Sequence, residues 1–189
     1  MKWEPVKGAL LSAAYYDIVE DNYVSQDPDN IQNFLQGGAV KSTGWEFEAV
    51  VRRPGGYEFS ASYSYVDARV KESSTTLTKG DRISAQPRHM ASAWGTKTFL
   101  VGDEWTFRAG AGLRYIGNKI DAQQIFITPA VTLFDAMLSA SYKDWVVSVN
   151  ASNVLNKKYY DLCSEFASPY GYCVAAKDRT VLLSLTRKF

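Results

Sequence analysis

The last eleven residues of the chain, RTVLLSLTRKF at 179–189, carry the pattern that decides the fold. Apolar side chains stand at alternate positions, namely Val181, Leu183, Leu185 and Phe189. Successive side chains of a strand point to opposite faces, so this segment is a strand with one apolar face, which Arg187 interrupts. Alone, it fits both the final strand of a soluble sandwich and the closing strand of a barrel that ends on an aromatic residue.

Length and composition limit the function classes. A chain of 189 residues can bury one domain core, and its aromatic fraction of 14% is high. The net charge of +1 gives no basic stripe, so nucleic acid is not an expected partner. Met1 is not followed by an apolar signal segment, and no apolar run approaches the roughly 18 residues of a membrane-spanning helix.

The alternating pattern recurs along the whole chain and predicts eight strands. They cover residues 8–19, 39–51, 57–66, 89–99, 105–115, 130–142, 145–152 and 179–189. Long polar connections at 20–38, 67–87, 116–128 and 153–178 alternate with tight turns such as 53–56. Long loops on one side and short turns on the other are typical of outer-membrane barrels.

The two faces of the expected strands differ in chemistry. The segment 57–66 is the cleanest case, with Tyr, Phe and Ala on one face and Glu and Ser on the other. Aromatic residues near strand ends are typical of membrane interfaces. A soluble barrel would put the apolar face inside, and a strand's sequence alone does not choose between the two. The loop asymmetry and Phe189 favour lipid on the outside. We therefore expect an all-β, antiparallel transmembrane β-barrel fold.

Two cysteines, Cys163 and Cys173, lie close together in the last long connection, with Pro169 and Gly171 between them. This spacing suits a disulfide that closes a loop in an oxidising compartment. Two unpaired thiols in a cytosolic protein remain the alternative.

Four charges on expected strands could carry chemistry. Glu46 and Glu48 share one strand face, as do Arg108 and Arg114. Paired carboxylates can act as acid and base. The plainer interpretation, which we prefer, is that all four line a wet lumen and that the carboxylates pair with the arginines. His89 stands without a Cys or carboxylate cluster, so we expect no metal site. The sequence shows no Ser-His-Asp order, Gly-rich phosphate loop or CxxC motif, so we expect no catalysis, and we expect no covalently bound cofactor.

Aromatic residues in the long connections are candidate ligand contacts, since bulky ligands bind aromatic surfaces with a few polar partners. The candidates are Tyr23, Phe34, Phe126, Phe166, Tyr170 and Tyr172. Packing within the loops or anchoring at an interface would explain them equally.

Eight sequence motifs, in order, resemble a known family. They are KWEP-x4-L (2–10), GWEFE (44–48), SYSYVDAR (62–69), QPRHMASAW (86–94), GAGLRYIG (110–117), LFDAMLSASYKDW (133–145), NASNVLNKKYYD (150–161) and RTVLLSLTRKF (179–189). Together they resemble the carboxy-terminal part of TonB-dependent outer-membrane siderophore receptors, of the ferrichrome and ferrioxamine type, in which a last loop with two cysteines is also typical. Arg187 departs from a tyrosine that the family often has.

The resemblance implies a fold and a function. The family has a 22-stranded, plugged barrel, so residues 1–189 would be its last part, without the plug domain and earlier strands. The complete receptor would take up ferric siderophores across the outer membrane. Its partners would be lipid, TonB through an amino-terminal region that these residues lack, and the barrel-assembly machinery through the last strand. We expect no uptake by these residues alone. The alternatives are a self-contained eight-stranded outer-membrane barrel with a structural or adhesive role, and a soluble ligand-carrying barrel.

Overall fold

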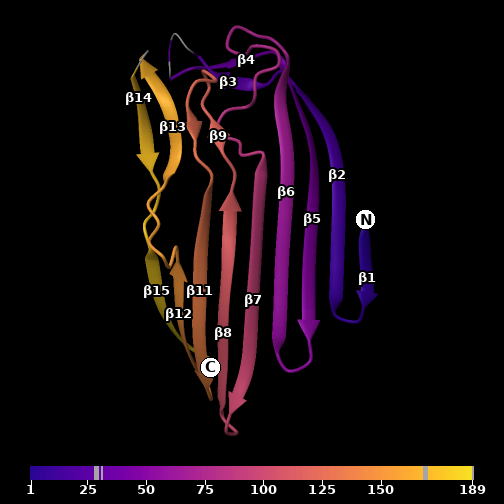
Figure 1. Cartoon of the computed structure of the whole chain (residues 1–189), viewed down its shortest axis with the longest axis vertical. Coiled ribbons are helices and arrows are strands. Elements are labelled where there is room, and N and C mark those ends of the chain that lie inside the picture. The colour runs from indigo at the N-terminus through magenta and orange to yellow at the C-terminus, as the bar shows by residue number, and fades with distance from the viewer. Residues whose placement is uncertain (28–29, 31, 168–169, 189) are drawn as a thin grey trace.

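The protein is built on one open, curved antiparallel sheet (Figure 1). The computed structural model describes residues 1–27, 30, 32–167 and 170–188, except for the side chains of residues 26, 166 and 167. Every regular element in those ranges is a strand. This part of the chain accordingly contains no helix long and apolar enough to cross a membrane.

Nine strands form the large sheet, in the order β1-β2-β5-β6-β7-β8-β11-β12-β15. Their bounds are β1 (Lys2–Val6), β2 (Ala9–Asp21), β5 (Ala39–Arg53), β6 (Tyr57–Glu72), β7 (His89–Val101), β8 (Trp105–Ile116), β11 (Val131–Tyr142), β12 (Trp145–Ser152) and β15 (Thr180–Arg187). Apart from the hairpins inside the long connections, each strand pairs with the next in sequence, so the sheet is an up-and-down meander. All eight predicted strands are present, most of them longer by one to six residues than their pattern indicates.

Within the large sheet, β1 is the strand that the sequence pattern did not predict. It is short, and its pairing with β2 shifts register between Trp3 and Val6, where Pro5 lies. Proline lacks the N–H that a central strand needs, and is tolerated at a sheet edge or a bulge. Pro5 and the short length of the strand are therefore the reasons why no alternating pattern marks β1 in the sequence.

The long connections contain more structure than expected. Three of them carry two-stranded hairpins: β3 (Val24–Gln26) with β4 (Phe34–Gln36), β9 (Lys119–Ile120) with β10 (Ile127–Thr128), and β13 (Tyr160–Ala167) with β14 (Tyr170–Ala175). β6 also continues to Glu72, so the polar loop expected from residue 67 was placed too early. The prediction of plain polar loops was wrong here. Backbone groups that are withdrawn from water must pair, and the runs of two or three residues in β3, β4, β9 and β10 are too short to show a period.

The tight turn between β5 and β6 is fixed by glycine. Gly55 and Gly56 have φ angles of 82° and 81°, a left-handed conformation that strains other residues. At Gly56 a Cβ atom would also lie 2.3 Å from the carbonyl oxygen of Thr98. The turn therefore fits against β7 only because residue 56 has no side chain.

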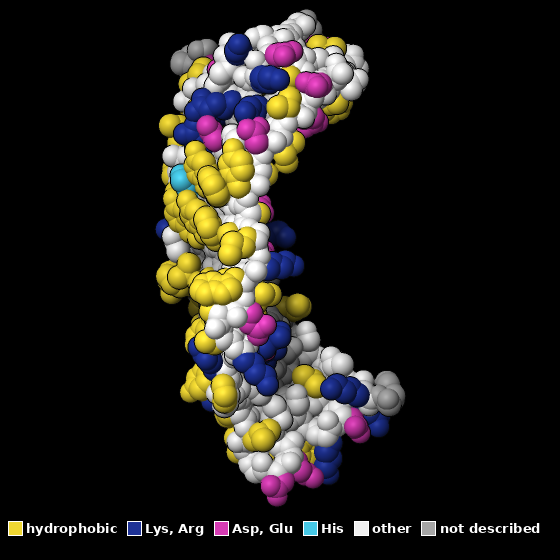
Figure 2. All heavy atoms as spheres, turned by 90° about the vertical axis from the view of Figure 1, so that its right-hand side faces the viewer, with side chains coloured by type: hydrophobic (Ala, Val, Ile, Leu, Met, Phe, Trp, Pro, Cys, Tyr) yellow, Lys and Arg dark blue, Asp and Glu magenta, His cyan; other side chains and the backbone are white. Residues whose placement is uncertain are grey.

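The two faces of the sheet are chemically distinct. Seen edge-on, hydrophobic side chains gather along the convex side, while Lys, Arg, Asp and Glu lie along the hollow of the concave side (Figure 2). Few hydrophobic residues are buried among those described, and most of them, including Val40, Val70 and Leu133, lie near the strand ends that lead to the long connections. Large apolar side chains that remain exposed over a whole face mark a surface covered by something other than water.

The sheet does not close on itself. β1 and β15 stand at opposite edges, and within the described residues each pairs on one side only. The alternative of a self-contained eight-stranded barrel is therefore wrong for this structure. The convex apolar face likewise argues against a soluble carrier, whose apolar face would line the inside.

Candidate functional site

Two rows of aromatic residues border the apolar convex face. At the long-connection end, Tyr15, Trp45, Tyr65 and His89 are register partners across β2, β5, β6 and β7. The rings of Tyr15 and Trp45 are 4.5 Å apart. At the short-turn end, Trp105, Tyr142 and Trp145 form the matching row across β8, β11 and β12, with 4.7 Å between the rings of Trp105 and Tyr142.

The spacing of these rows fits a bilayer. On β7 the rows lie at His89 and at Val101, the partner of Trp105. Twelve strand residues rise about 40 Å, which a tilt of about 45° reduces to about 28 Å along the membrane normal. The hydrocarbon core of a bilayer is about 30 Å thick. The convex face therefore has the dimensions of a lipid-facing surface with an aromatic belt at each interface.

The four charges singled out in the sequence share the concave face, but the carboxylates do not pair with the arginines as expected. Arg114 donates to both carboxylate oxygens of Asp135, from Nε at 2.5 Å and from one Nη at 3.0 Å. Arg108 reaches Glu58 at 2.6 Å, and Glu48 accepts a hydrogen bond from Ser12.

Strand register explains why. Glu48 and Arg114 lie in one cross-strand row, but β6 and β7 run between their strands. Neighbouring strands are about 4.8 Å apart, so the two residues are separated by about 14 Å. Asp135, in contrast, is on β11 directly beside β8. The shared face was predicted correctly and the pairing was not.

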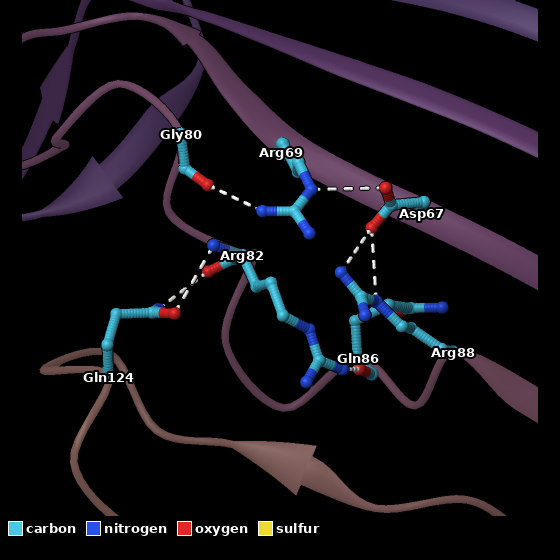
Figure 3. A network of polar contacts seen from close by, with 7 residues as sticks. All are labelled: Asp67, Arg69, Gly80, Arg82, Gln86, Arg88 and Gln124. Atoms are coloured by element: carbon cyan, nitrogen blue, oxygen red, sulfur yellow. Dashed lines mark hydrogen bonds and ion pairs between the residues drawn. The ribbon is translucent and has the colours of Figure 1, made fainter.

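A continuous set of contacts joins the four long connections into what we call the loop crown. Ser25 of β3 hydrogen-bonds Thr76 of the 73–88 connection. That connection meets the β9–β10 hairpin through Gln124, whose amide nitrogen donates to the carbonyl of Arg82 at 2.8 Å (Figure 3). The β9–β10 hairpin in turn binds β13, since the amide of Cys163 donates to the hydroxyl of Thr128 at 2.7 Å.

Asp121 organises the contact between the β9–β10 and β13–β14 hairpins. Its side chain is only 1% exposed. One carboxylate oxygen accepts hydrogen bonds from the amides of Ile125 and Phe126, at 2.8 and 3.0 Å. The other accepts from the amide of Glu165 at 3.2 Å. A buried carboxylate is stable when backbone donors satisfy it in this way. No sequence motif marked Asp121, because its donors belong to two connections far apart in the chain.

The disulfide prediction is confirmed. Cys163 and Cys173 are bonded to each other and are register partners on β13 and β14. The alternative of two free thiols is thereby excluded. The bond ties the hairpin together on the part of β13 that faces Thr128.

A pocket of about 740 Å³ opens among the loops of the crown. Its lining includes Tyr23, Asp27, Thr76, Asp81, Gln123 and Gln124. Val70 also lines it, and by alternation along β6 Val70 belongs to the concave face. Pockets for small molecules usually have volumes of 300–1,000 Å³ and combine apolar walls with a few polar groups. The crown can therefore hold a bulky, polar ligand on the concave side of the sheet.

The aromatic candidates for ligand contact are dispersed by the structure. Tyr23 lines the pocket. Phe126 packs on Gly171, where a Cβ would lie 2.6 Å from its ring, so it joins two hairpins. Phe34, Tyr170 and Tyr172 are exposed on β4 and β14. The side chain of Phe166 and all of Phe189, the barrel-terminal residue of the sequence prediction, lie outside what the structure describes.

Residues 1–154 match the family model described as TonB dependent receptor-like, beta-barrel. The chain belongs to this family. It is 28% identical over its whole length to the ferrioxamine B receptor of Salmonella typhimurium (strain SL1344), of which it covers 27%. It is 26% identical to the ferrichrome outer membrane transporter/phage receptor of Escherichia coli (strain K12), with 95% of this chain and 24% of that protein covered.

Solved receptors share the fold of this chain. The ferric yersiniabactin uptake receptor FyuA from Yersinia pestis superposes with a TM-score of 0.82 over 100% of this chain and 28% of that one, at 16% identity. The sheet is thus a segment of a TonB-dependent receptor barrel, and the resemblance read from the sequence motifs is confirmed. The chain spans about a quarter of the length of the curated relatives that it matches.

Proposed function

We propose that this chain supplies nine strands of an outer-membrane receptor that imports ferric siderophores of the hydroxamate type by TonB-dependent uptake. Family membership supports receptor function. The names of the relatives, a ferrioxamine B receptor and a ferrichrome transporter, support the substrate class. Binding and transport, rather than catalysis, are the proposed activities. TonB would act through parts of the receptor outside these 189 residues.

The observation that carries the proposal is the pocket in the loop crown. It lies at the end of the sheet where all four long connections meet, and it borders the concave face. A ligand bound there would stand at the mouth of the barrel lumen. The hydroxyl, amide and carboxylate groups that line the pocket match a polar, bulky complex better than an apolar one. In this proposal, Tyr23 and Gln123 contact the ligand directly.

The test is uptake of radioactive iron by cells that lack their own hydroxamate receptors and carry the complete receptor containing this segment. Ferrioxamine B and ferrichrome are the probes, and a ferric catecholate is the comparison. We expect saturable uptake of a hydroxamate complex that disappears when TonB is deleted. Residues 1–189 alone should give none. Absence of uptake with every ferric siderophore, from a receptor that reaches the membrane folded, would contradict the proposal.

Two substitutions test the pocket itself. Tyr23→Ala with Gln123→Ala should raise the half-saturation concentration about tenfold, as loss of central contact residues does at binding sites. Lys79→Ala is the matched control, because Lys79 is exposed in the same crown and does not line the pocket. Equal effects of the two variants would place the ligand elsewhere.

A further inference from the structure

Cations gather on the outward face directly beyond the aromatic row of Tyr15, Trp45 and Tyr65. Arg69 and Arg88 bind Asp67, Arg82 is the bridge partner of Arg69, and we call these four residues the arginine cluster (Figure 3). Arg69 donates to Asp67 at 3.1 Å, and Arg88 donates to its other oxygen at 2.9 Å. By alternation along β6, Asp67 and Arg69 lie on the same face as Tyr65. The cluster therefore stands on the lipid-facing side, at headgroup level.

The hydrogen bonds within the cluster do not use all the N–H donors of its arginines. The guanidinium of Arg69 also donates to the carbonyl of Gly80, and that of Arg82 to the carbonyl of Gln86. Each arginine carries five N–H donors, so these bonds leave several donors for another acceptor. Burial and the neighbouring charge of Arg88 lower the pKa of Arg82, although an arginine in a protein stays charged.

The charged residues beside the cluster do not neutralise its excess positive charge. Lys41 is the register partner of Arg69 on β5 and pairs with Asp17 at 2.9 Å. The cluster and this neighbouring ion pair together, counted among the described residues, hold four cations but only two carboxylates. The cations are Arg69, Arg82, Arg88 and Lys41, and the carboxylates are Asp67 and Asp17. Arginine forks fit the geometry of phosphate oxygens, with bidentate charge-assisted hydrogen bonds.

An apolar groove runs on the same face below the cluster. The first three outward residues of β7 after His89 are small, namely Ala91, Ala93 and Gly95, and the larger Lys97, Phe99 and Val101 follow toward the short-turn end. Phe59 leans over Gly95, where a Cβ would lie 3.2 Å from its ring. A depression of about 640 Å³ follows, lined on this face by Phe59, Ala61, Ala93, Ala111, Leu113 and Phe134.

The groove has the right depth for an acyl chain. Ala61 and Ala93 lie four residues below Tyr65 and His89, about 14 Å along the strands, which a tilt of about 45° reduces to about 10 Å along the membrane normal. One leaflet of a bilayer has a hydrocarbon depth of about 15 Å. A lipid whose headgroup meets the arginine cluster would therefore lay a chain along the small residues of β7.

We propose that the arginine cluster and the β7 groove together form a binding site for a phosphate-bearing membrane lipid, in the leaflet on the long-connection side. The site rests on the membrane placement in the proposed function, but not on the siderophore. The three arginines bind the phosphate, and Ala91, Ala93 and Gly95 provide the floor for one acyl chain. The lipid would hold the 73–88 connection, and with it one wall of the crown pocket, against the outside of the barrel.

The test measures lipid binding to the complete detergent-purified receptor by native mass spectrometry. The probes are long-chain phosphatidic acid, which carries a phosphate monoester, and phosphatidylcholine. We expect selective binding of phosphatidic acid. R69Q/R82Q/R88Q should raise its Kd about a hundredfold, because each basic residue near an anionic lipid surface contributes roughly a factor of five. R53Q/K97Q/K143Q removes as many cations at the short-turn end and should change Kd less than about twofold.

The groove needs its own variant. Ala93→Phe fills the depression and should weaken long-chain phosphatidic acid about tenfold or more, while short-chain phosphatidic acid changes little. Val149→Phe, on the same face of β12, is the control. The proposal fails if the arginine triple variant, still folded by its heat-shifted gel mobility, keeps wild-type Kd. It fails equally if A93F leaves long-chain binding unchanged, or if equimolar inorganic phosphate displaces the lipid, which would show a free-anion site. Siderophore uptake is a separate readout, so failure here leaves the proposed function standing.

Discussion

The carboxylate of Asp121 accepts a hydrogen bond from the backbone amide of Glu165, 44 residues further along the chain, at 3.2 Å. The same side chain closes its own β9–β10 hairpin through two more amides. One buried residue therefore fixes both the shape of a hairpin and its contact with the disulfide-bonded neighbour. Only an acceptor with two oxygens can do both.

Asp121→Asn tests this role. Asparagine keeps the size of the side chain but replaces one acceptor oxygen by a donor, so at least one buried amide loses its partner. We expect a local cost of about 1–3 kcal/mol. Hydrogen exchange of the amides of residues 125, 126 and 165 should accelerate accordingly. Asp161→Asn is the control, since the exposed Asp161 carboxylate pairs, among the described residues, with Lys119 of the same crown. Unchanged exchange in D121N would show that the hairpins are held by other contacts.

Reduction of the disulfide should loosen the crown without opening the sheet. Cys163 and Cys173 lie in a hairpin outside the nine-stranded sheet, so the cross-link constrains a short local loop. In the chain-entropy model such a loop is stabilised by roughly 3 kcal/mol.

Limited proteolysis with and without a thiol reductant measures this effect. New cleavage should fall between residues 160 and 175, while the heat-modifiable band of the folded receptor stays in place. C163S/C173S should behave like the reduced wild type. Loss of the folded band on reduction would mean that the hairpin supports the barrel itself.

The Arg114–Asp135 pair should couple more strongly than the Arg52–Glu58 pair on the same concave face. Asp135 has a side chain 14% exposed and also accepts from the amide of Asn153 at 2.9 Å. Arg52 is 73% exposed. Exposed ion pairs contribute about 0–1 kcal/mol, whereas partly buried, bidentate pairs contribute more.

A double-mutant cycle on each pair separates these values. Arg114→Ala, Asp135→Ala and the double variant would be unfolded in urea from detergent, and Arg52 and Glu58 treated in the same way. The coupling free energy for Arg114–Asp135 should exceed about 1 kcal/mol, and that for Arg52–Glu58 should lie below it. D135A alone should cost the most, because it also leaves the Asn153 amide without its acceptor. Equal couplings would show that water screens both pairs alike.

The β5–β6 turn offers a test of steric fit against backbone strain. Gly56→Ala places a methyl group 2.3 Å from the Thr98 carbonyl oxygen at a φ of 81°. Gly102→Ala has a φ of 62° and nothing within 4 Å of the new atom. Gly102→Ala, the control, should lower the free energy of unfolding by about 1–2 kcal/mol through backbone strain alone. Gly56→Ala should cost clearly more, read as a lower refolding yield and urea midpoint. Similar costs would mean that the turn moves away from β7 freely.

Much of the fold was predictable because a strand is a local pattern. The alternation at residues 57–66 sets Tyr63 and Tyr65 on one face and Glu58 on the other, and the structure keeps that division. Turn positions followed from Pro54, Gly55 and Gly56, whose backbone preferences act within four residues. β1 was missed because Pro5 and five residues of length leave no clear period.

The candidate site was predictable only in part. The disulfide could be read from spacing, since both cysteines belong to one hairpin. The pairing of Arg114 could not, because it depends on which strand lies beside β8. Asp121 carried no signal at all, because its partners come from the 125–126 turn and from Glu165. Of the aromatic candidates whose side chains the structure describes, only Tyr23 lines the crown pocket.

By itself, the sequence determined where the eight predicted strands of the large sheet lie, which face of each is apolar and which connections are long. These properties follow from side-chain chemistry repeated at a period of two, and they need no knowledge of neighbours. The tertiary structure alone decided which strands lie side by side, and hence that Arg114 meets Asp135 and that Asp121 joins two hairpins. It also decided that the sheet is open, since within the described residues β1 and β15 each pair on one side only.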